Sequence, residues 1–330
     1  MNARPAAPPD DQLLRLSSDR IEVALLPGKG ADIYSFVDRE SGLDTLFKTP
    51  WGWRDAAAAR APDSQSAWLS RYPGGWQQLL PNAGPAREQD GVVLGYHGEA
   101  ALVPWQIREV TDGRAQLAVE LLTVPLRLER TVTVIDSSCQ VHDVVRNLSP
   151  DPVAVRWVQH PVFGAPFVDG DTRIDTSAGR FLSDRDTPGT GILPDTLTRF
   201  PILPGVDGDA DLRVIPGPNA PRAVFGALTD VGTNAWFSLT SPNAGFGVRL
   251  AWDAAVYPHA WFWQECHASG GFPWFRRAYA VAVEPANILP GEGVSAGLRR
   301  GDGPRLAGGA EWTSEITLGR FDLPAVERTE

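Results

Sequence analysis

The segment RLERTVTV, residues 127–134, alternates large apolar or β-branched side chains with polar ones. Such alternation is typical of an antiparallel strand with one buried face, because successive side chains of a strand point to opposite faces. Strand-like patterns lie on both sides of it, at residues 115–122 and 139–147. This part of the chain therefore predicts an antiparallel sheet packed against a core.

The same kind of pattern recurs along the whole chain. Residues 21–26 and 31–37 flank a Pro-Gly break and predict a hairpin. Further strands are expected at residues 153–158, 223–228, 235–239, 246–252 and 279–284. The chain has 33 glycines and 29 prolines among 330 residues, well above the average share of about 12%. The fold class that these patterns predict is all-β, a large antiparallel β-sandwich.

The domain organisation follows from where turn-rich and polar segments lie. Residues 1–13 are polar and Pro-rich and predict a flexible tail, and residues 14–330 predict a single domain because no interior linker interrupts them. The best short helix candidate is residues 56–60. Residues 180–220, rich in Asp, Gly, Pro and Thr, predict a long surface excursion.

Composition argues against several kinds of partner. A net charge of −10 disfavours binding to nucleic acid, whose phosphates repel an acidic protein. No apolar stretch approaches the roughly 20 residues of a membrane-spanning helix, and the N-terminal residues lack the apolar core of a signal peptide. Cys139 and Cys266 lie far apart and form no CxxC pair. We expect two reduced thiols in a cytoplasmic protein with no nucleic-acid or membrane partner.

Familiar catalytic and metal motifs are missing from the sequence. The five histidines form no HxH, HExxH or mixed Cys/His set, so no metal site is expected. There is no GxSxG elbow, P-loop or GxGxxG after a strand. A glycosidase-like carboxylate partner for Glu284 stays open, because sequence spacing does not decide it. His142 is expected to be structural or exposed, and His259 and His267 have no assigned role.

Three segments combine aromatic and polar residues among turn formers. They are RYPGGWQQLLPNAG (71–84) with YHGE (96–99), WVQHPVFG (157–164), and YPHAWFWQE (257–265) with AVEPA (282–286). Sugars have apolar C–H faces and polar edges, so their sites combine aromatic rings with amide, carboxylate, imidazole or guanidinium groups. The chain has 12 tryptophans, and half lie in or beside these segments. The segments predict a carbohydrate site, with core packing as the alternative for any single tryptophan.

At these segments the chain resembles the aldose 1-epimerase (galactose mutarotase-like) family. The resemblance rests on GGWQQLLPNAG (74–84), YHGE (96–99), QHPVFGAPF (159–167) and AVEPA (282–286), in the family's order. The opening LLPGKGADIYSFVDRESG (25–42) is similar to the family's first hairpin, so the likeness covers about residues 20–320. It implies a galactose mutarotase-like supersandwich that holds a monosaccharide in an open cleft without a cofactor.

The resemblance also implies roles for particular residues. Glu284 would be the catalytic base, His160 the catalytic acid, and His97 a sugar ligand. Galactose members of the family carry an Asn-Arg pair where this chain has Asn82 followed by alanine, so the identity of the sugar stays open. The other residues expected to bind substrate are Arg71, Trp76, Gln77, Glu99, Trp263 and Gln264.

The function implied is interconversion of the α and β anomers of a monosaccharide by ring opening and closing. An ionised Glu284 would take the proton of the C1 hydroxyl while an imidazolium at His160 protonates the ring oxygen. One alternative is another sugar-active enzyme of the same fold, such as a sugar-phosphate epimerase or a keto-sugar isomerase. A phosphate-binding version would bring Arg71, Arg276 and Arg277 to the cleft. The other alternative is a non-catalytic carbohydrate-binding protein. The chain is expected to be a monomer or a homodimer.

Overall fold

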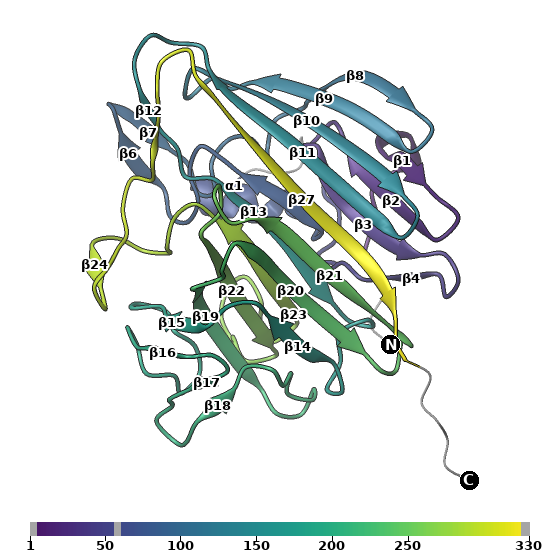
Figure 1. Cartoon of the computed structure of the whole chain (residues 1–330), viewed down its shortest axis with the longest axis vertical. Coiled ribbons are helices and arrows are strands. Elements are labelled where there is room, and N and C mark those ends of the chain that lie inside the picture. Colours follow the sequence, from purple (N-terminus) through teal and green to yellow (C-terminus); the bar gives the residue numbers. More distant parts are fainter. Residues whose placement is uncertain (1–4, 56–60, 325–330) are drawn as a thin grey trace.

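The computed structural model describes residues 5–55 and 61–324, which form two large antiparallel sheets, four two-stranded ribbons, one α-helix and one 3₁₀ turn (Figure 1). In spatial order, the first sheet contains β1 (Leu14–Ser17), β2 (Ile21–Leu26), β3 (Asp32–Asp38), β5 (Trp76–Leu79), β13 (Val158–Gly164), β23 (Tyr279–Ala286), β22 (His259–Cys266), β19 (Arg222–Thr229), β15 (Arg180–Ser183) and β16 (Leu197–Arg199), with β4 (Leu43–Asp44) paired to β3.

The second sheet packs against the first. Its strands in spatial order are β14 (Arg173–Thr176), β20 (Asn234–Ser241), β21 (Phe246–Asp253), β27 (Glu311–Asp322), β11 (Ser138–Asn147), β10 (Leu126–Ile135), β9 (Arg114–Glu120) and β8 (Gln106–Thr111). The ribbons pair β6 (Arg87–Gln89) with β7 (Val92–Leu94), β12 (Val153–Ala154) with β26 (Arg305–Leu306), β17 (Ile202–Leu203) with β18 (Ala210–Asp211), and β24 (Val294–Ser295) with β25 (Leu298–Arg299). The remaining elements are η1 (Asp10–Gln12) and α1 (Ser64–Ser70). The predicted fold class, mostly β with large antiparallel sheets, is confirmed.

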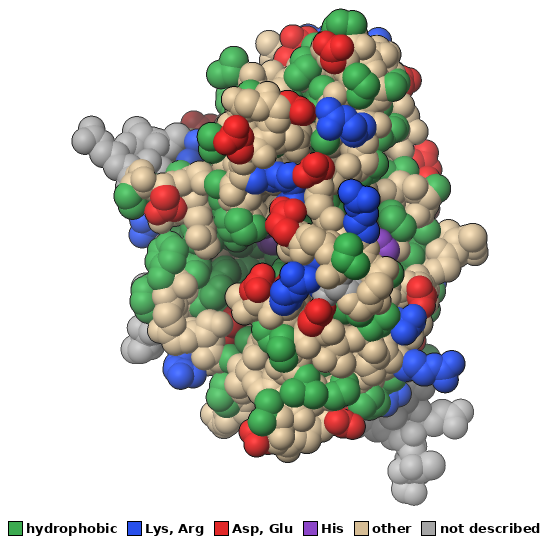
Figure 2. All heavy atoms as spheres, turned by 90° about the vertical axis from the view of Figure 1, so that its left-hand side faces the viewer, with side chains coloured by type: hydrophobic (Ala, Val, Ile, Leu, Met, Phe, Trp, Pro, Cys, Tyr) green, Lys and Arg blue, Asp and Glu red, His purple; other side chains and the backbone are tan. Residues whose placement is uncertain are grey.

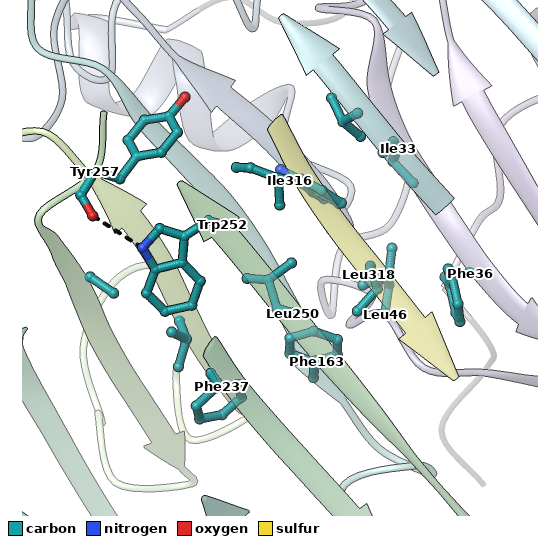
Figure 3. Packing of buried hydrophobic residues seen from close by; sticks show 14 of the residues in the cluster. Ile33, Phe36, Leu46, Phe163, Phe237, Leu250, Trp252, Tyr257, Ile316 and Leu318 are labelled. Atoms are coloured by element: carbon teal, nitrogen blue, oxygen red, sulfur yellow. Dashed lines mark hydrogen bonds between the residues drawn. The ribbon is translucent and has the colours of Figure 1, made fainter. Parts of the chain in front are cut away.

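The core lies between the two sheets, where their inward faces meet. In Figure 3, Ile33 and Phe163 of the first sheet share one cluster with Phe237, Leu250 and Ile316 of the second. Strand β10 alternates buried and more exposed residues as its sequence predicts. Apolar burial of this kind is the main stabilising term of folding.

One residue on the buried face of β10 is charged. Arg130 is fully buried and forms two 2.8 Å hydrogen bonds to the carboxylate of Asp143 on β11. Its guanidinium also donates to the side chain of Gln159 on β13, at 3.2 Å. The Arg130–Asp143 pair therefore ties the second sheet to the first by hydrogen bonds inside the apolar core.

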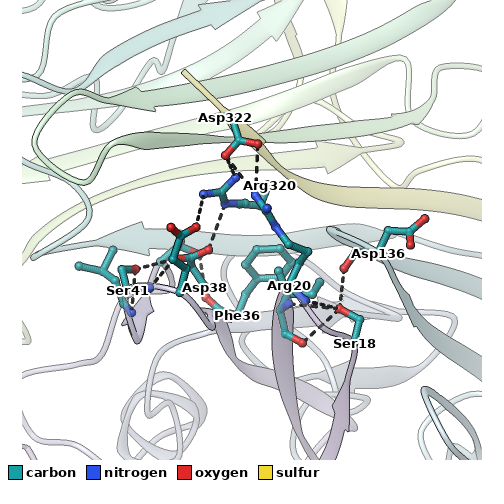
Figure 4. A network of polar contacts seen from close by, with 12 residues as sticks. Ser18, Arg20, Phe36, Asp38, Ser41, Asp136, Arg320 and Asp322 are labelled. Carbon is teal, nitrogen blue, oxygen red and sulfur yellow. Dashed lines mark hydrogen bonds and ion pairs between the residues drawn. The ribbon is translucent and has the colours of Figure 1, made fainter. Parts of the chain in front are cut away.

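A second polar link joins the sheets at one end of the sandwich. Arg320 of β27 donates to Asp38 of β3 at 3.0 Å and also pairs with Asp322 (Figure 4). Asp38 in turn accepts from the backbone N–H and hydroxyl of Ser41, at 2.8 and 2.6 Å. The last strand is thus fixed to the opposite sheet near the first hairpin.

Several local predictions need correction. The predicted helix at residues 56–60 lies outside the described residues, and the observed helix α1 begins after its N-cap Asp63, which accepts from the Ser66 N–H at 2.8 Å. The strand predicted at residues 153–158 is interrupted, because Val155 and Arg156 bond to the carbonyls of Pro304 and Pro81 instead of to a ladder.

The turn-rich region at residues 180–220 is also more ordered than a surface excursion. Its strands β15 and β16 form one edge of the first sheet.

Within the predicted N-terminal tail, residues 10–12 form η1, and the flexibility of the tail stays a prediction. No helix in residues 5–55 or 61–324 has the length and apolar character needed to cross a membrane. Both cysteines are buried and free.

The Arg130 link can be tested with a matched pair of variants on one strand. We expect Arg130→Met to lower the free energy of unfolding by about 3–5 kcal/mol, because it leaves Asp143 charged and buried without its partner. Arg127→Met on the same strand removes a partly exposed arginine that pairs with Glu120 and Glu129, and should cost less than about 1 kcal/mol. Urea unfolding measures both, and equal losses would contradict the assignment.

Candidate functional site

A cavity of about 710 Å³ opens on the outer face of the first sheet. Its walls come from β13, β19, β22, β23, helix α1 and residues 186–190. Figure 2 shows that one face of the molecule is hollowed, with hydrophobic side chains on one side of the hollow and charged side chains along the other. A cavity of this size with a few convergent polar groups is typical of a small-molecule site.

A second hollow, of about 500 Å³, lies on the outer face of the second sheet. Of its two tryptophans, Trp252 is buried in the core, and Trp236 has the guanidinium of Arg249 over its ring, 4.1 Å from the centroid. The ring face that would pack against a ligand is therefore already covered. The cavity on the first sheet is the better candidate site.

Glu284 and His160 meet in the candidate cavity. They come from the neighbouring strands β23 and β13, and His160 Nε2 lies 3.6 Å from Glu284 Oε1. The side chains of His160 and Glu284 are only 11% and 4% exposed. The two predicted catalytic residues are thus brought together at a distance that one substrate atom can bridge.

Burial shifts the pKa values of this pair in opposite directions. Desolvation raises the pKa of the Glu284 carboxyl to about 8. Desolvation, helped by the positive charge of Lys29, lowers the pKa of His160 to about 4. At neutral pH the site therefore holds a protonated carboxyl and a neutral imidazole. This is the reverse of the ionised Glu284 and imidazolium His160 that we expected, because neither charge has a strong buried counter-ion.

His97 has a fixed hydrogen-bonding orientation. Its backbone has φ of 58°, and its Nδ1 accepts from the Gly84 N–H at 3.0 Å. Desolvation and the neighbouring His160 lower the pKa of His97 well below its usual range. The ring is therefore neutral, and its hydrogen is on Nε2. Asn82 supports this geometry, because its amide donates to the carbonyls of Pro85 and Gly95, both at 2.9 Å.

Aromatic rings surround the two histidines. Trp68 of α1 lies 4.6 Å from His97 and 6.0 Å from His160 between ring centroids, and Tyr72 lies 5.7 Å from His160. The Tyr72 hydroxyl is buried and has no hydrogen-bond partner among the described residues. Burial, followed by the charge of Glu284, raises the pKa values of Tyr72 and Tyr96. Both hydroxyls thus stay protonated and available as donors.

Sequence reasoning missed these aromatic neighbours. Tyr72 lay within a segment that was singled out, but it was not assigned to the site. Trp68 was missed together with α1, although Asp63 three residues before Ser66 is an N-cap signal that predicts a helix start there.

The remaining predicted substrate residues divide by the side of the sheet that they face. Trp263 borders the cavity. Gln264, next to it on β22, points to the opposite side, where it is buried and accepts from Arg222 at 2.8 Å. Trp76 also faces the core, and its indole donates to Gln159 at 2.9 Å. Side-chain alternation along the strands thus places Trp76 and Gln264 away from the cavity.

Gln77 lies on the same sheet face as His160 but beneath the cavity wall. Its amide donates at 2.7 Å to Asp32, which forms a fully buried ion pair with Lys29. Gln77 therefore supports the wall and makes no part of the cavity surface.

Arg71 is the C-cap of α1, and it does not line the cavity.

Glu99 has a structural role and does not line the cavity. Its carboxylate accepts from the backbone N–H groups of Leu122 and Thr123, both at 2.8 Å, and from the Thr123 hydroxyl at 2.7 Å. These bonds fix the turn before β10, and the contribution of Glu99 to sugar binding stays a prediction.

The arginines that a phosphate-binding site would require also lie outside the lining of the cavity. Arg276 donates to the Ala268 carbonyl at 3.0 Å, and Arg277 donates to the Pro50 carbonyl at 2.8 Å. Within the described residues, no lysine or arginine lines the cavity. Across residues 5–55 and 61–324, no group of three or more His, Cys, Asp or Glu side chains is arranged to hold a metal ion.

Comparison with known proteins identifies the fold. No protein-family model and no curated protein sequence matches this chain. Among solved structures, the chain is similar to a galactose mutarotase related enzyme from Lactobacillus acidophilus, with a TM-score of 0.65 and 15% identity over 95% of this chain and 98% of that one.

Two further structures agree. A galactose mutarotase-like protein from Clostridium acetobutylicum matches with a TM-score of 0.66 and 13% identity, over 94% of this chain and 95% of that one. The GalM/aldose epimerase homologue from C. elegans matches with a TM-score of 0.61 and 14% identity, over 94% and 99% of the two chains. The chain therefore has the galactose mutarotase-like fold, as the sequence resemblance implied. Identities this low establish the fold and leave the activity to the site itself.

The raised pKa of Glu284 predicts a pH-dependent gain in stability for Glu284→Gln. Unfolded glutamate ionises near pH 4.5, whereas folded Glu284 holds its proton up to about pH 8, so the wild-type protein loses stability between these values. Glutamine does not ionise, so the variant avoids this loss. It should be more stable than the wild-type protein by up to about 3 kcal/mol at pH 7, with little gain at pH 4.5.

Urea unfolding at both pH values measures this difference. Glu315→Gln, which changes an exposed glutamate on β27, is the matched control and should show no pH-dependent gain. A gain for Glu284→Gln that does not depend on pH would contradict the buried-carboxyl interpretation.

Proposed function

We propose that this protein is an aldose 1-epimerase, which interconverts the α and β anomers of a sugar by opening and closing its ring. The observation that carries the proposal is the 3.6 Å approach of Glu284 and His160 inside an aromatic cavity. Anomer exchange requires one group to accept the C1 hydroxyl proton while another donates a proton to the ring oxygen. The pair offers one acceptor and one donor at the same place.

The protonation of the pair fits this chemistry. Between about pH 4 and pH 8 the two groups together hold one proton. The donor gives that proton to the ring oxygen, the acceptor takes the C1 hydroxyl proton, and the C1–O5 bond breaks to give the open-chain aldehyde. Rotation about C1–C2 then presents the other carbonyl face, and the transfers reverse as the ring closes.

The pH dependence of the reaction is the same whichever residue carries the proton. With the pKa values found here the proton lies on Glu284, so the carboxyl is the donor and the His160 imidazole the acceptor. If bound sugar moves the proton to His160, the roles become those implied by the family resemblance. Both arrangements have the same total protonation, so they titrate as one coupled pair.

The surrounding groups suit a sugar bound at this pair. The Nε2–H of His97 and the hydroxyl of Tyr72 are donors for sugar oxygens. Trp261 is the direct cross-strand neighbour of Glu284, and its indole borders the cavity. An indole there offers an apolar face for the C–H side of a ring. A phosphorylated substrate is less suited, since the described cavity lining has three carboxylates, Asp186, Glu265 and Glu284, and no cation.

The direct test is catalysis of anomer exchange, measured by exchange NMR on a panel of free aldoses and reducing disaccharides. We expect Glu284→Gln and His160→Asn each to lower the rate by roughly 10²–10⁴-fold, because each removes one partner of the proton transfer. His142→Asn and Glu315→Gln are matched controls, since these residues form a cross-strand pair on the other sheet and should retain full activity.

The outcomes separate the candidate functions. Near-normal exchange by both site variants would show that the acid/base assignment is wrong. Binding without any accelerated exchange in the wild-type protein would instead indicate a carbohydrate-binding protein.

The shifted pKa values also predict the pH profile. The acceptor is lost when both groups are protonated, below about pH 4, and the donor is lost when both are deprotonated, above about pH 8. We therefore expect kcat/KM for exchange to be flat between these values and to fall tenfold per pH unit beyond them. A single transition near pH 6.5, the ordinary histidine value, would contradict the proposed environment of His160.

A further inference from the structure

The cavity is longer than the catalytic pair requires. On β22, Trp261 is the neighbour of Glu284, whereas Trp263 and Glu265 follow along the same side of the strand and also border the cavity. Each two-residue step along a strand advances about 6.6 Å, so Glu265 lies about 13 Å beyond Trp261. We call the region around Trp263, Phe225, Ser269 and residues 186–190 the distal half of the cavity.

One wall of the distal half consists of aromatic side chains that pack against one another. Trp263 contacts Trp274, with ring centroids 5.1 Å apart, and Trp274 stacks on Trp51 at 5.4 Å with an interplanar angle of 25°. Phe225 lies directly beside Trp263 on β19 and also lines the cavity. Trp263 is the member of the stack nearest to Glu284 on the sheet, and it stays half-buried. The stack therefore holds an indole in position at the cavity edge without covering it fully.

Residues 186–190, on the rim of the cavity, are held in position by hydrogen bonds and include polar side chains. Buried Asp184 accepts from the backbone N–H groups of Asp186 and Thr187, at 3.0 and 2.9 Å. The rim also pairs with β19, because the Thr190 N–H donates to Ala223 and the Phe225 N–H donates to Pro188. A Cβ at Gly189 would lie 2.0 Å from the Ala223 carbonyl oxygen, so this close pairing requires glycine there.

We propose that the distal half is a subsite for a second sugar ring, so that the preferred substrate is an uncharged reducing disaccharide. This inference rests on the proposed function and specifies its substrate class. Trp263 provides an apolar surface for a sugar face. For its polar edge, Asp186 provides carboxylate oxygens and Thr190 a hydroxyl, whereas the Thr187 hydroxyl already donates to Asp184.

The reaction itself limits how the second ring is attached. Anomer exchange needs a free C1 hydroxyl on the ring at Glu284 and His160, so the second ring is linked through another hydroxyl of that ring. Glu265, deeper in the distal half, already accepts from the Ala268 and Ser269 N–H groups, at 2.6 and 3.0 Å. It fixes residues 268–269, which also border the cavity, and with Asp186 it disfavours an anionic second group.

The test compares anomer exchange for glucose and galactose with that for maltose, cellobiose and lactose. We expect kcat/KM to be at least tenfold higher for one or more disaccharides than for their reducing-end sugar. Trp263→Ala should lower this ratio roughly tenfold, which corresponds to about 1.4 kcal/mol, and Trp263→Phe should recover most of it because an aromatic face remains. Trp236→Ala, on the other sheet, is the matched control and should leave the ratio unchanged.

Binding to the Glu284→Gln variant, measured by calorimetry with the same sugars, separates this inference from the proposed function. Tighter disaccharide binding that Trp263→Ala removes supports the subsite even if the wild-type protein catalyses no exchange. Exchange that is as fast on the monosaccharides, or a ratio that Trp263→Ala does not change, would overturn the subsite and leave the epimerase proposal intact.

Discussion

The orientation of β13, the strand that carries His160, depends on the side-chain amide of Gln159. Its oxygen accepts from Trp76 and Arg130, at 2.9 and 3.2 Å, and its nitrogen donates to Asp143 at 2.8 Å and to the Tyr257 hydroxyl at 3.3 Å. Every partner is buried, so rotating the amide outward would leave several polar groups unsatisfied in the core. Because side chains alternate along a strand, fixing Gln159 inward directs His160 outward into the cavity.

The buried charged groups Arg130, Asp143 and Glu284, which lie on either side of the first sheet, differ in whether an opposite charge compensates them. Behind the sheet, Arg130 and Asp143 are buried but fully paired, so their charges are compensated. In front of it, Glu284 is equally buried, yet its carboxylate gains no compensation strong enough to offset desolvation, and its pKa rises to about 8. Pairing offsets the desolvation cost of a buried charge, whereas an uncompensated buried carboxyl lowers stability. Groups with pKa values shifted in this way cluster at functional sites, so the contrast supports the proposed site on the outer face.

Sequence patterns predicted much of the fold and part of the site. The alternation in residues 127–134 identified β10, and the ordered motifs identified Glu284, His160 and His97, which the structure brings into one cavity. The side-chain directions of Trp76 and Gln264 were missed, because their motif positions do not reveal which sheet face each residue takes. The rim at residues 186–190 was missed for a different reason. Its backbone pairing with β19 depends on tertiary contact, and a turn-rich composition gives no sign of it.

Glu284 and the distal half of the cavity are linked through β23. On the outer face of β23, Glu284 is preceded at two-residue intervals by Ala282 and Ala280, which are the cross-strand neighbours of Trp263 and Glu265. Both alanines are fully buried within the cluster against which Trp263 and Trp274 pack. Small side chains at these positions let the indoles lie over β23, and a larger residue would displace them toward the cavity. The same alternation that presents the carboxyl of Glu284 therefore also leaves room for the aromatic wall, so β23 contributes to both the length of the cavity and its chemistry.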